Sequence, residues 1–296
     1  MAREGRVQYR AEDPCAHWPP AVRGRFPPRC VEMAAGSRSG WWRSGDGPPT
    51  FPRSGVVSLV ERVLLACARP IDVACTGRPY LVVAPHPDDE TLGCGATIAR
   101  ARHAGIPVHV VLVTDGSGHP PAFPDRALLV SLRRDETLAA CGILGVPASH
   151  VVFLGFPDGQ ATAHAGRVAE RLAELIGRID PERVFGPSEL DNHADHRAVA
   201  AALKGLARRG EVRGGIYCYP VWFWYPRFLL RAFCRGDFLR LRRTLAGPYL
   251  DLKKQAIAKH ASQAGCLDPA NAILMPEFLR RFLRPHEYFF EHRSRS

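Results

Sequence analysis

From about residue 56 onward, the chain alternates between short, continuous apolar runs and longer segments with helical spacing of their apolar residues. The runs include "YLVVAP" (80–85), "PVHVVLVTDG" (107–116) and "HVVFLGFPDG" (150–159), and the helical segments span 10–18 residues. Apolar strands that alternate with helices are typical of a parallel sheet buried on both faces. We therefore predict an α/β fold, a Rossmann-like three-layer sandwich whose mostly parallel sheet carries helices on both faces.

Residues 1–55 differ from this pattern. They are rich in Arg, Pro, Gly and Ser and show no sustained periodicity. A segment of this composition buries too little apolar surface to offset the entropy of ordering it. We predict a disordered or loosely attached N-terminal extension at 1–55 and a single domain at 56–296.

Composition also bears on the compartment. The chain has nine cysteines, an odd number, and no Cys-x-x-Cys spacing, which fits buried free thiols in a reduced compartment. The first residues, "MAREGRVQYRAEDPC", are too polar for a signal peptide. No stretch approaches about 20 uninterrupted apolar residues. We therefore expect a cytoplasmic protein with no transmembrane segment.

The net charge of +11 raises the question of an acidic partner. The arginines are scattered and form no recognition-helix or zinc-finger pattern, so we expect no nucleic-acid partner. The segment at 222–243, "WFWYPRFLLRAFCRGDFLRLRR", combines aromatic, aliphatic and arginine side chains. It fits a lid over the pocket, a contact in a homo-oligomer, or a basic amphipathic helix in peripheral contact with a membrane. The sequence leaves these three alternatives, and with them the oligomeric state, open.

Four polar clusters follow the predicted strands: "HPDDE" (86–90), "TDGSGH" (114–119), "FPDG" (156–159) and "ELDNHADH" (189–196). Because functional groups of parallel sheets lie at the carboxyl ends of the strands, we expect these clusters to converge at one edge. The first cluster holds three acids and an imidazole within five positions, where repulsion and desolvation are costly. A bound metal cation would offset both costs.

The last cluster adds two histidines, His193 and His196, on one face of a predicted helix start. Taken alone, such a helix start is also ordinary capping. Together with His86 and its neighbouring acids, it offers two histidines and one carboxylate, the donor set of a catalytic zinc that keeps a fourth position for water. One more carboxylate is then needed as a general base for that water.

These motifs resemble those of the PIG-L/LmbE-like deacetylases, zinc hydrolases that remove acetyl groups from N-acetylglucosaminyl compounds. "PHPDDE" (85–90) is similar to the family's Ala-His-Pro-Asp-Asp-Glu motif, and "HADH" (193–196) is similar to its His-Pro-Asp-His motif. The resemblance covers about residues 78–265. It implies the LmbE-like deacetylase fold, a small-molecule glycoconjugate substrate and a Zn²⁺ cofactor, with another divalent metal as the alternative.

The resemblance also implies roles for single residues. The implied metal ligands are His86, Asp89 and His196. Asp88 would be the general base, and His193 would face the developing oxyanion or protonate the leaving amine, with Asp195 orienting it.

Three further segments resemble substrate-binding parts of the family. "LRRDETLAACGILG" would place Arg133 near the sugar, "GFPDG" would place Asp158 at sugar hydroxyls, and "KKQAIAKHASQ" would place His260 in the pocket lining. Arg133 also fits a solvated helix face, and Asp158 in Pro-Asp-Gly also fits an ordinary turn.

The sequence departs from the family's motifs at three positions. Pro85 replaces an alanine, Ala194 replaces a proline, and Asp191 stands where some members have a tyrosine. Because of the last departure, we expect no tyrosine oxyanion partner from this loop. Two alternatives to the deacetylase remain: a hydrolase of a different amide in small-molecule metabolism, and a non-catalytic relative that binds a sugar or nucleotide.

Overall fold

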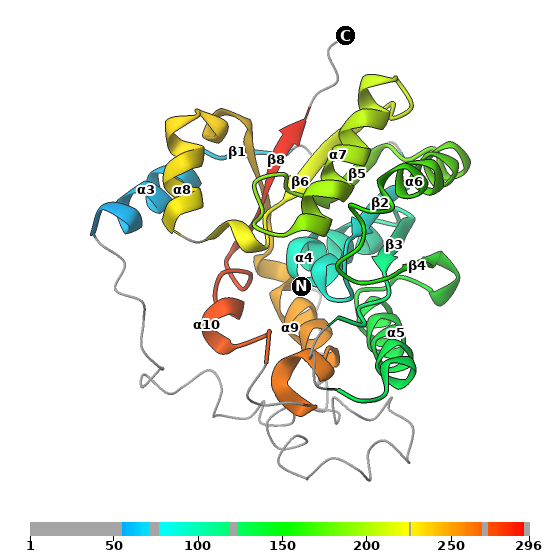
Figure 1. The fold of residues 1–296 in the computed structure, drawn as a ribbon. Coiled ribbons are helices and arrows are strands. Elements are labelled where there is room, and N and C mark those ends of the chain that lie inside the picture. Colours follow the sequence, from blue (N-terminus) through cyan, green and yellow to red (C-terminus); the bar gives the residue numbers. More distant parts are fainter. Residues whose placement is uncertain (1–54, 72–76, 119–122, 225, 268–271, 293–296) are drawn as a thin grey trace, which may run out of the picture.

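The computed structural model describes residues 55–71, 77–118, 123–224, 226–267 and 272–292 (Figure 1). The predicted extension at 1–55 lies outside the described residues except for Gly55, which begins the first helix. The predicted domain at 56–296 contains all other described residues.

The centre of the fold is one eight-stranded sheet with the order β1-β7-β8-β6-β5-β2-β3-β4. The strands are β1 (Arg69–Pro70), β2 (Tyr80–Ala84), β3 (Val108–Thr114), β4 (Val151–Phe156), β5 (Arg183–Pro187), β6 (Gly215–Tyr219), β7 (Leu241–Leu245) and β8 (His286–His292). All strand pairs are parallel except the two that involve β8. The predicted mostly parallel sheet is therefore confirmed.

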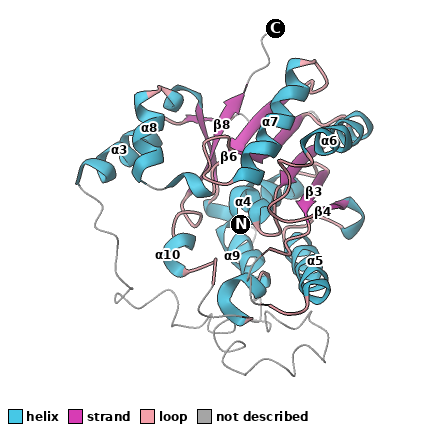
Figure 2. Cartoon of the chain, viewed as in Figure 1, coloured by secondary structure: helices cyan, strands magenta, loops and turns pink. Residues whose placement is uncertain are grey.

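Helices cover both faces of this sheet (Figures 1 and 2). They are α3 (Gly55–Ala66), α4 (Asp89–His103), α5 (Arg126–Ile143), α6 (Ala165–Ile179), α7 (Ala194–Arg208), α8 (Pro226–Cys234), α9 (Leu250–Lys259) and α10 (Pro276–Leu279). α4, α5 and α9 pack together on one face, and α6 packs against α7 on the other. The three-layer α/β architecture agrees with the prediction.

The sequence pattern explains the central strands. All five residues of β2 are buried, and β3 is buried at every residue except His109. Both strands lie between helix layers, so both of their faces need apolar side chains. This produces the continuous apolar runs of the sequence.

The strand order also determines where a site can form. After β2 the chain moves through α4 to β3 on one side, and it later returns to β5 on the other side of β2. The carboxyl ends of β2 and β5 therefore flank a topological switch point, the place where open α/β sheets bind ligands. "HPDDE" follows β2 and "DNHADH" follows β5, so the fold brings the two motifs together.

The apolar and aromatic run that begins at Gly214 has the composition of one long strand. In the structure β6 ends at Tyr219, and a short 3₁₀ helix, η2 (Trp222–Trp224), follows. Its aromatic side chains Phe223 and Trp224 are buried in the core. Among the described residues, none of the helices is long and apolar enough to cross a membrane.

Candidate metal and catalytic site

The site begins where β2 passes into α4. Asp88 lies at the N-terminus of α4 with φ 120°, a backbone conformation that favours glycine. Strained residues of this kind persist only where the surrounding structure holds them, and they cluster at functional sites. The Asp88 backbone N–H donates a hydrogen bond of 3.0 Å to Glu90 Oε2, so the third acid of the motif braces the turn.

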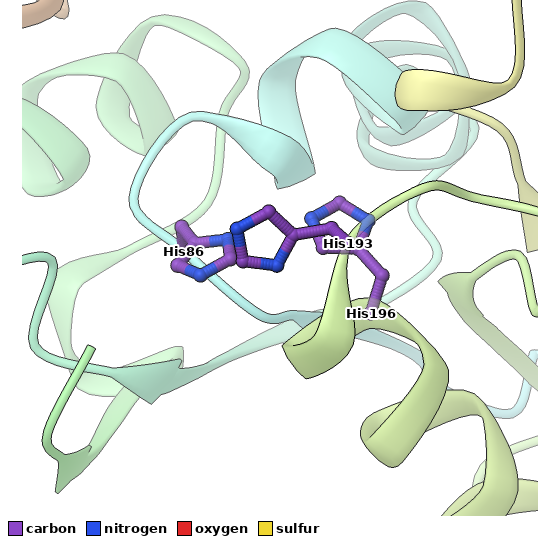
Figure 3. Close-up of side chains that lie close together, drawn as sticks. All are labelled: His86, His193 and His196. Atoms are coloured by element: carbon purple, nitrogen blue, oxygen red, sulfur yellow. The ribbon is translucent and has the colours of Figure 1, made fainter. Parts of the chain in front are cut away.

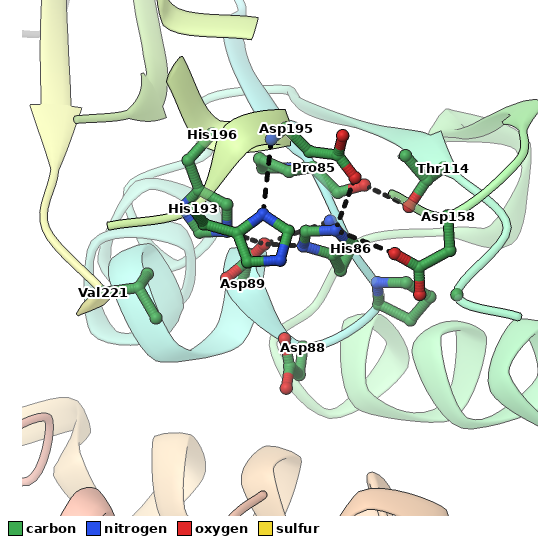
Figure 4. Close-up of polar contacts among 12 residues, drawn as sticks. Pro85, His86, Asp88, Asp89, Thr114, Asp158, His193, Asp195, His196 and Val221 are labelled. Atoms are coloured by element: carbon green, nitrogen blue, oxygen red, sulfur yellow. Dashed lines mark hydrogen bonds and ion pairs between the residues drawn. The ribbon is translucent and has the colours of Figure 1, made fainter. Parts of the chain in front are cut away.

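Asp89, in the first turn of α4, joins His86 to His196 (Figure 4), two of the three histidines that lie close together in Figure 3. Its Oδ2 lies 3.2 Å from His86 Nδ1 and 3.2 Å from His196 Nε2. A tetrahedral zinc ion holds such ligands about 3.3 Å apart, because its bonds are roughly 2.0–2.1 Å long. His196 Nε2 is buried and has no hydrogen-bond partner among the described residues. Asp89 Oδ2 therefore lies at ligand spacing from both histidines, and the binding of one cation by these three side chains stays a prediction.

A carboxylate fixes the orientation of His196. Its Nδ1 lies 2.8 Å from Asp191 Oδ2, and the same carboxylate accepts hydrogen bonds from the backbone N–H groups of Val221 and Trp222. Metal-binding histidines commonly donate their second N–H to a carboxylate in this way. The arrangement places the proton on Nδ1 and leaves the Nε2 lone pair toward Asp89.

The second nitrogen of His86 faces two further acids. His86 Nε2 lies 3.1 Å from Asp195 Oδ2 and 3.2 Å from Asp158 Oδ1 (Figure 4). Asp195 also accepts hydrogen bonds from the backbone N–H groups of Gly159 and Ala161. Its carboxylate therefore orients His86 and the loop after β4, and the described contact of Asp195 with His193 is made by its backbone N–H. His86, Asp158 and Asp195 form a second group with metal-ligand spacing.

His193 precedes α7 and lies within ligand range of the other imidazoles. One ring nitrogen from each of His86, His193 and His196 lies within 4.8 Å of the others. His193 Nδ1 accepts a hydrogen bond of 3.3 Å from the Asp195 backbone N–H, which leaves the ring proton on Nε2. Burial, with the positive charge of His86 and His196, lowers the pKa of His193 to about 4, so the ring is neutral near pH 7.

The charges of the three proposed ligands depend on one another. Burial opposes the charge of His196, but Asp89 and Asp191 outweigh it and raise the pKa of His196 to about 9. Burial also opposes the charge of His86, whose pKa is raised by Asp158, Asp195 and Asp89. Burial opposes ionisation of Asp89, but the two histidines outweigh it and lower the Asp89 pKa. Protons on both histidines thus balance the carboxylates in the metal-free protein.

Asp88 behaves differently from its neighbour Asp89. Its carboxylate makes no hydrogen bond or ion pair with any residue that the structure describes, although only 5% of the residue is exposed. Burial, with repulsion from Asp89 and Glu90, raises the pKa of Asp88 well above its usual value. A carboxylate with a raised pKa and no partner is suited to accept a proton.

The three predicted substrate-binding residues differ in position. Asp158 contacts the site through its ion pair with His86. Burial alone would raise the pKa of Asp158, but the hydrogen bond and charge of His86 have the larger combined effect and lower it to about 2. Arg133 is only 2% exposed, and its guanidinium donates a hydrogen bond of 2.6 Å to the Gly116 carbonyl. His260 is fully buried, with Nε2 3.2 Å from Glu90 Oε1. Arg133 and His260 therefore lie beneath the site loops, and a direct sugar contact by either stays a prediction.

The sequence analysis missed a buried ion pair, Lys253 with Glu287, that contacts the middle of α4. The Glu287 carboxylate accepts hydrogen bonds from the backbone N–H groups of Ala96 and Thr97 at 2.9 and 2.8 Å, and from Lys253 Nζ at 2.6 Å. Lys253 Nζ also donates to the Leu92 carbonyl at 2.7 Å. A side-chain pair from α9 and β8 thus bonds the backbone of the helix that carries the site acids.

The segment after α9 supports the site loop from below. Gln263 Nε2 donates a hydrogen bond to the Pro87 carbonyl at 2.5 Å, and Ser262 bonds Glu136 of α5 through its backbone N–H and its hydroxyl, at 2.7 and 2.6 Å. "KKQAIAKHASQ" was expected to line the pocket, whereas its described contacts hold the "HPDD" turn and α5 together. The only sequence signal for this role was the polar residues at a helix end.

The fold and the site together define a class: a Rossmann-like α/β domain with a histidine–carboxylate cluster at its switch point. Residues 81–207 match the family model described as PIG-L: GlcNAc-PI de-N-acetylase. The matched residues make up less than half of the chain, and the match agrees with the resemblance that the two motifs indicated.

Individual curated proteins are also similar in sequence to this chain. The chain is 31% identical over 151 residues to a 2'-N-acetylparomamine deacetylase from Streptomyces fradiae, a match that covers 44% of this chain and 52% of that protein. The chain spans 52–64% of the length of the first curated relatives that it matches. Their whole-protein activities are therefore not transferred directly to this chain.

Solved structures show the same fold. N,N'-diacetylchitobiose deacetylase from Pyrococcus horikoshii aligns with a TM-score of 0.54 and 20% identity, covering 83% of this chain and 94% of that one. The 4-carboxy-2-hydroxymuconate hydratase GalB from Pseudomonas putida KT2440 also gives a TM-score of 0.54 and 20% identity, covering 74% and 98%. Because a deacetylase and a hydratase share this fold, the activity has to be argued from the site.

Proposed function

We propose that the chain is a metal-dependent N-deacetylase that removes the acetyl group from an N-acetylglucosaminyl-type conjugate. The observation that carries this proposal is the position of Asp89 Oδ2, 3.2 Å from both His86 Nδ1 and His196 Nε2, beside the unpartnered carboxylate of Asp88. The family match and the amino-sugar deacetylase among the relatives support the reaction type. A cytoplasmic location and a small-molecule glycoconjugate substrate are parts of the same proposal.

In this proposal His86, Asp89 and His196 hold a divalent metal, with Zn²⁺ as the expected ion. When bound, the metal lowers the pKa of a water toward 7. Asp88 takes the proton from the attacking water, because burial and its acidic neighbours raise its pKa. Asp195 and Asp158 keep His86 oriented through Nε2.

His193 acts on the carbonyl side of the amide. Its Nδ1 is occupied by the Asp195 backbone N–H, so the Nε2–H is the group that can donate a hydrogen bond to the developing oxyanion. A neutral ring suffices for this role, and one such donor is worth about 3–4 kcal/mol in a transition state. Protonation of the leaving amine would need a proton gained during the reaction, since the pKa of His193 is lowered to about 4.

The test is acetate release from a panel of N-acetylated amino sugars and their conjugates, measured alongside the metal content of the purified protein. We expect about one divalent metal per chain and turnover that a chelator abolishes and added Zn²⁺ restores. Full metal occupancy in a His86→Ala/His196→Ala variant would contradict the ligand assignment. Preference for an acetylated lysine peptide or a simple aliphatic amide over every N-acetylglucosaminide would contradict the substrate class.

A second candidate reaction is addition of water to an unsaturated small-molecule acid. The hydratase with the same fold is the observation that favours it. The same panel decides between the two, because a hydratase consumes its substrate without releasing acetate. A non-catalytic binder is disfavoured because the strained backbone and lone carboxylate of Asp88 would serve no purpose in it.

A further inference from the structure

Two segments far apart in the sequence form one unit at an end of the sheet. α3 leads into β1, and α8 leads through a short 3₁₀ helix, η3 (Asp237–Arg240), into β7. β1 pairs with β7, and α3 packs beside α8 (Figure 1). We call these residues, 55–70 and 226–245, the α3/α8 module. The module lies outside residues 81–207, the part of the chain that matches the family.

The module carries most of the exposed apolar side chains of the described protein. Seven large hydrophobic residues are exposed in the described part of the chain, and six of them belong to the module. They are Leu59 (60% exposed), Val63, Leu230, Phe233, Leu239 (67%) and Leu245. Four of the six lie on the adjoining helices α3 and α8, Leu239 lies on η3 and Leu245 on β7. Isolated exposed leucines are normal on a protein surface, but such a concentration in one module indicates a contact surface.

The exposed charged side chains of the module are all positive. Arg62, Arg231 and Arg235 are exposed on α3 and α8. The only acids in the module, Glu61 and Asp237, are both buried and ion-paired, Glu61 with Arg284 and Asp237 with Arg240. The exposed face therefore combines apolar side chains with arginines and offers no exposed carboxylate.

We propose that the α3/α8 module docks on a membrane surface that contains anionic phospholipids. Apolar side chains enter the acyl-chain boundary, and arginine guanidinium groups bind lipid phosphates. A second copy of this chain is disfavoured, because it would bring arginines against arginines. Residues 1–54 are disfavoured for the same reason, since they contain nine arginines and only five acids.

The module is joined to the site through the sheet and through the residues that precede α8. The backbone N–H groups of Val221 and Trp222 donate to Asp191, which orients His196, and α8 begins four residues after Trp222. Docking on a membrane would therefore set the position of the sheet edge that carries the site. The proposal concerns binding alone and does not depend on the deacetylase assignment.

The experiment is co-sedimentation of the full chain with vesicles, one set of pure phosphatidylcholine and one that also contains phosphatidylglycerol, at low salt. We expect binding only to the second set. Arg62→Gln/Arg231→Gln should weaken binding roughly fivefold for each arginine, or about 25-fold together. Leu59→Ser/Leu239→Ser removes the two most exposed apolar side chains and should weaken binding about tenfold or more.

Two variants serve as matched controls. Arg208→Gln/Arg213→Gln removes the same charge from exposed arginines at and beyond the end of α7. Met275→Ser changes the one exposed large apolar residue that the structure describes outside the module. Both should bind vesicles as the unchanged chain does. Equal losses in the control and the module variants would contradict the proposal, and so would absence of binding to the anionic vesicles.

Two other outcomes would assign the surface to a different occupant. A concentration-dependent dimer that Leu59→Ser/Leu239→Ser abolishes, without vesicle binding, would show that a second copy covers it. Vesicle binding that appears only after removal of residues 1–54 would show that this segment covers it. Either result would overturn the proposal for the full chain.

Discussion

Helix α4 contacts two buried, charged regions, which differ in whether their polar side chains have hydrogen-bond partners. At its first turn, the Asp88 carboxylate has no partner among the described residues, and the neighbouring His196 Nε2, from α7, has no hydrogen bond there. In the middle of the helix, Glu287 accepts four hydrogen bonds, and Lys253 donates to both a carbonyl and that carboxylate. Both regions are almost fully buried.

The difference separates a site from a structural brace. A buried charge with all its bonds made stabilises one arrangement of the chain, whereas a buried polar atom without a partner costs free energy. Such a cost persists in a fold where a ligand, metal or proton later supplies the missing partner. On this criterion Asp88 and His196 belong to a site, and Lys253 and Glu287 hold the helix that presents it.

The largest effect is expected at Asp88. Asp88→Asn removes the proton acceptor and keeps the shape, so kcat should fall about 10²–10⁴-fold while the metal stays bound. Asp89→Asn is the matched variant, one residue away with the same chemical change, and it should weaken metal binding instead. Steady-state kinetics and metal analysis on both proteins separate the two roles. Near-normal turnover in Asp88→Asn, or loss of metal from it, would mean that the roles are misassigned.

Glu287→Gln tests the structural side of the comparison. The change leaves the ammonium of Lys253 buried without its counter-charge, and breaking a buried ion pair costs about 3–5 kcal/mol. Urea unfolding of the metal-free protein measures this loss. The control is Glu174→Gln on α6, which removes an exposed pair with Arg171 and should cost about 1 kcal/mol or less. Equal losses in the two variants would show that the contacts of Glu287 and Lys253 with α4 add nothing to the free energy of unfolding.

Asp191→Asn tests the boundary between the two regions, since Asp191 is hydrogen-bonded to the backbone and also contacts a proposed ligand. Loss of its charge weakens the hydrogen bond that orients the His196 ring, so metal affinity should fall about 10–100-fold. Competition with a chromophoric chelator measures the affinity. Asp251→Asn, whose side chain is 87% exposed, provides a control that should leave it unchanged. Unchanged affinity in Asp191→Asn would remove His196 from the ligand set.

The smallest effect is the pH dependence of metal binding. In the metal-free protein the pKa of His196 is raised to about 9 and that of His86 is also raised, so protons occupy the nitrogens that the metal needs. Raising the pH removes these competitors, and the dissociation constant should fall about tenfold per pH unit for each proton released between about pH 6 and 8. Glu287 is not in contact with these nitrogens, so Glu287→Gln should keep the same slope. A flat profile would show that both histidines are already neutral.

The sequence predicted the parts of the fold that local pattern determines. The apolar runs of β2 and β3 and the helices between them follow from burial on both faces, and "HPDDE" and "HADH" could be placed at the strand ends. β7 was not predicted, because "LRRTL" carries two arginines and shows no apolar run. The aromatic run after Tyr219 looked like more strand because burial alone does not distinguish a strand from a 3₁₀ turn.

The sequence did not predict contacts between residues that lie far apart along the chain. Glu287 lies 191 residues from Ala96 and Ser262 lies 126 residues from Glu136, and nothing in the local pattern joins them. Asp191 was noticed only as a departure from the family motif. An acid five residues before a proposed ligand histidine was the available signal, because a helix start brings those positions together.

The bond between Glu287 and α4 bears on the order in which the protein matures. A ribosome delivers the chain from its amino end, so α4 emerges long before β8. Until residue 287 has left the ribosome, Lys253 and the amides of Ala96 and Thr97 lack their carboxylate. We therefore expect the helix that carries the site acids to be among the first elements synthesised and among the last to become fixed.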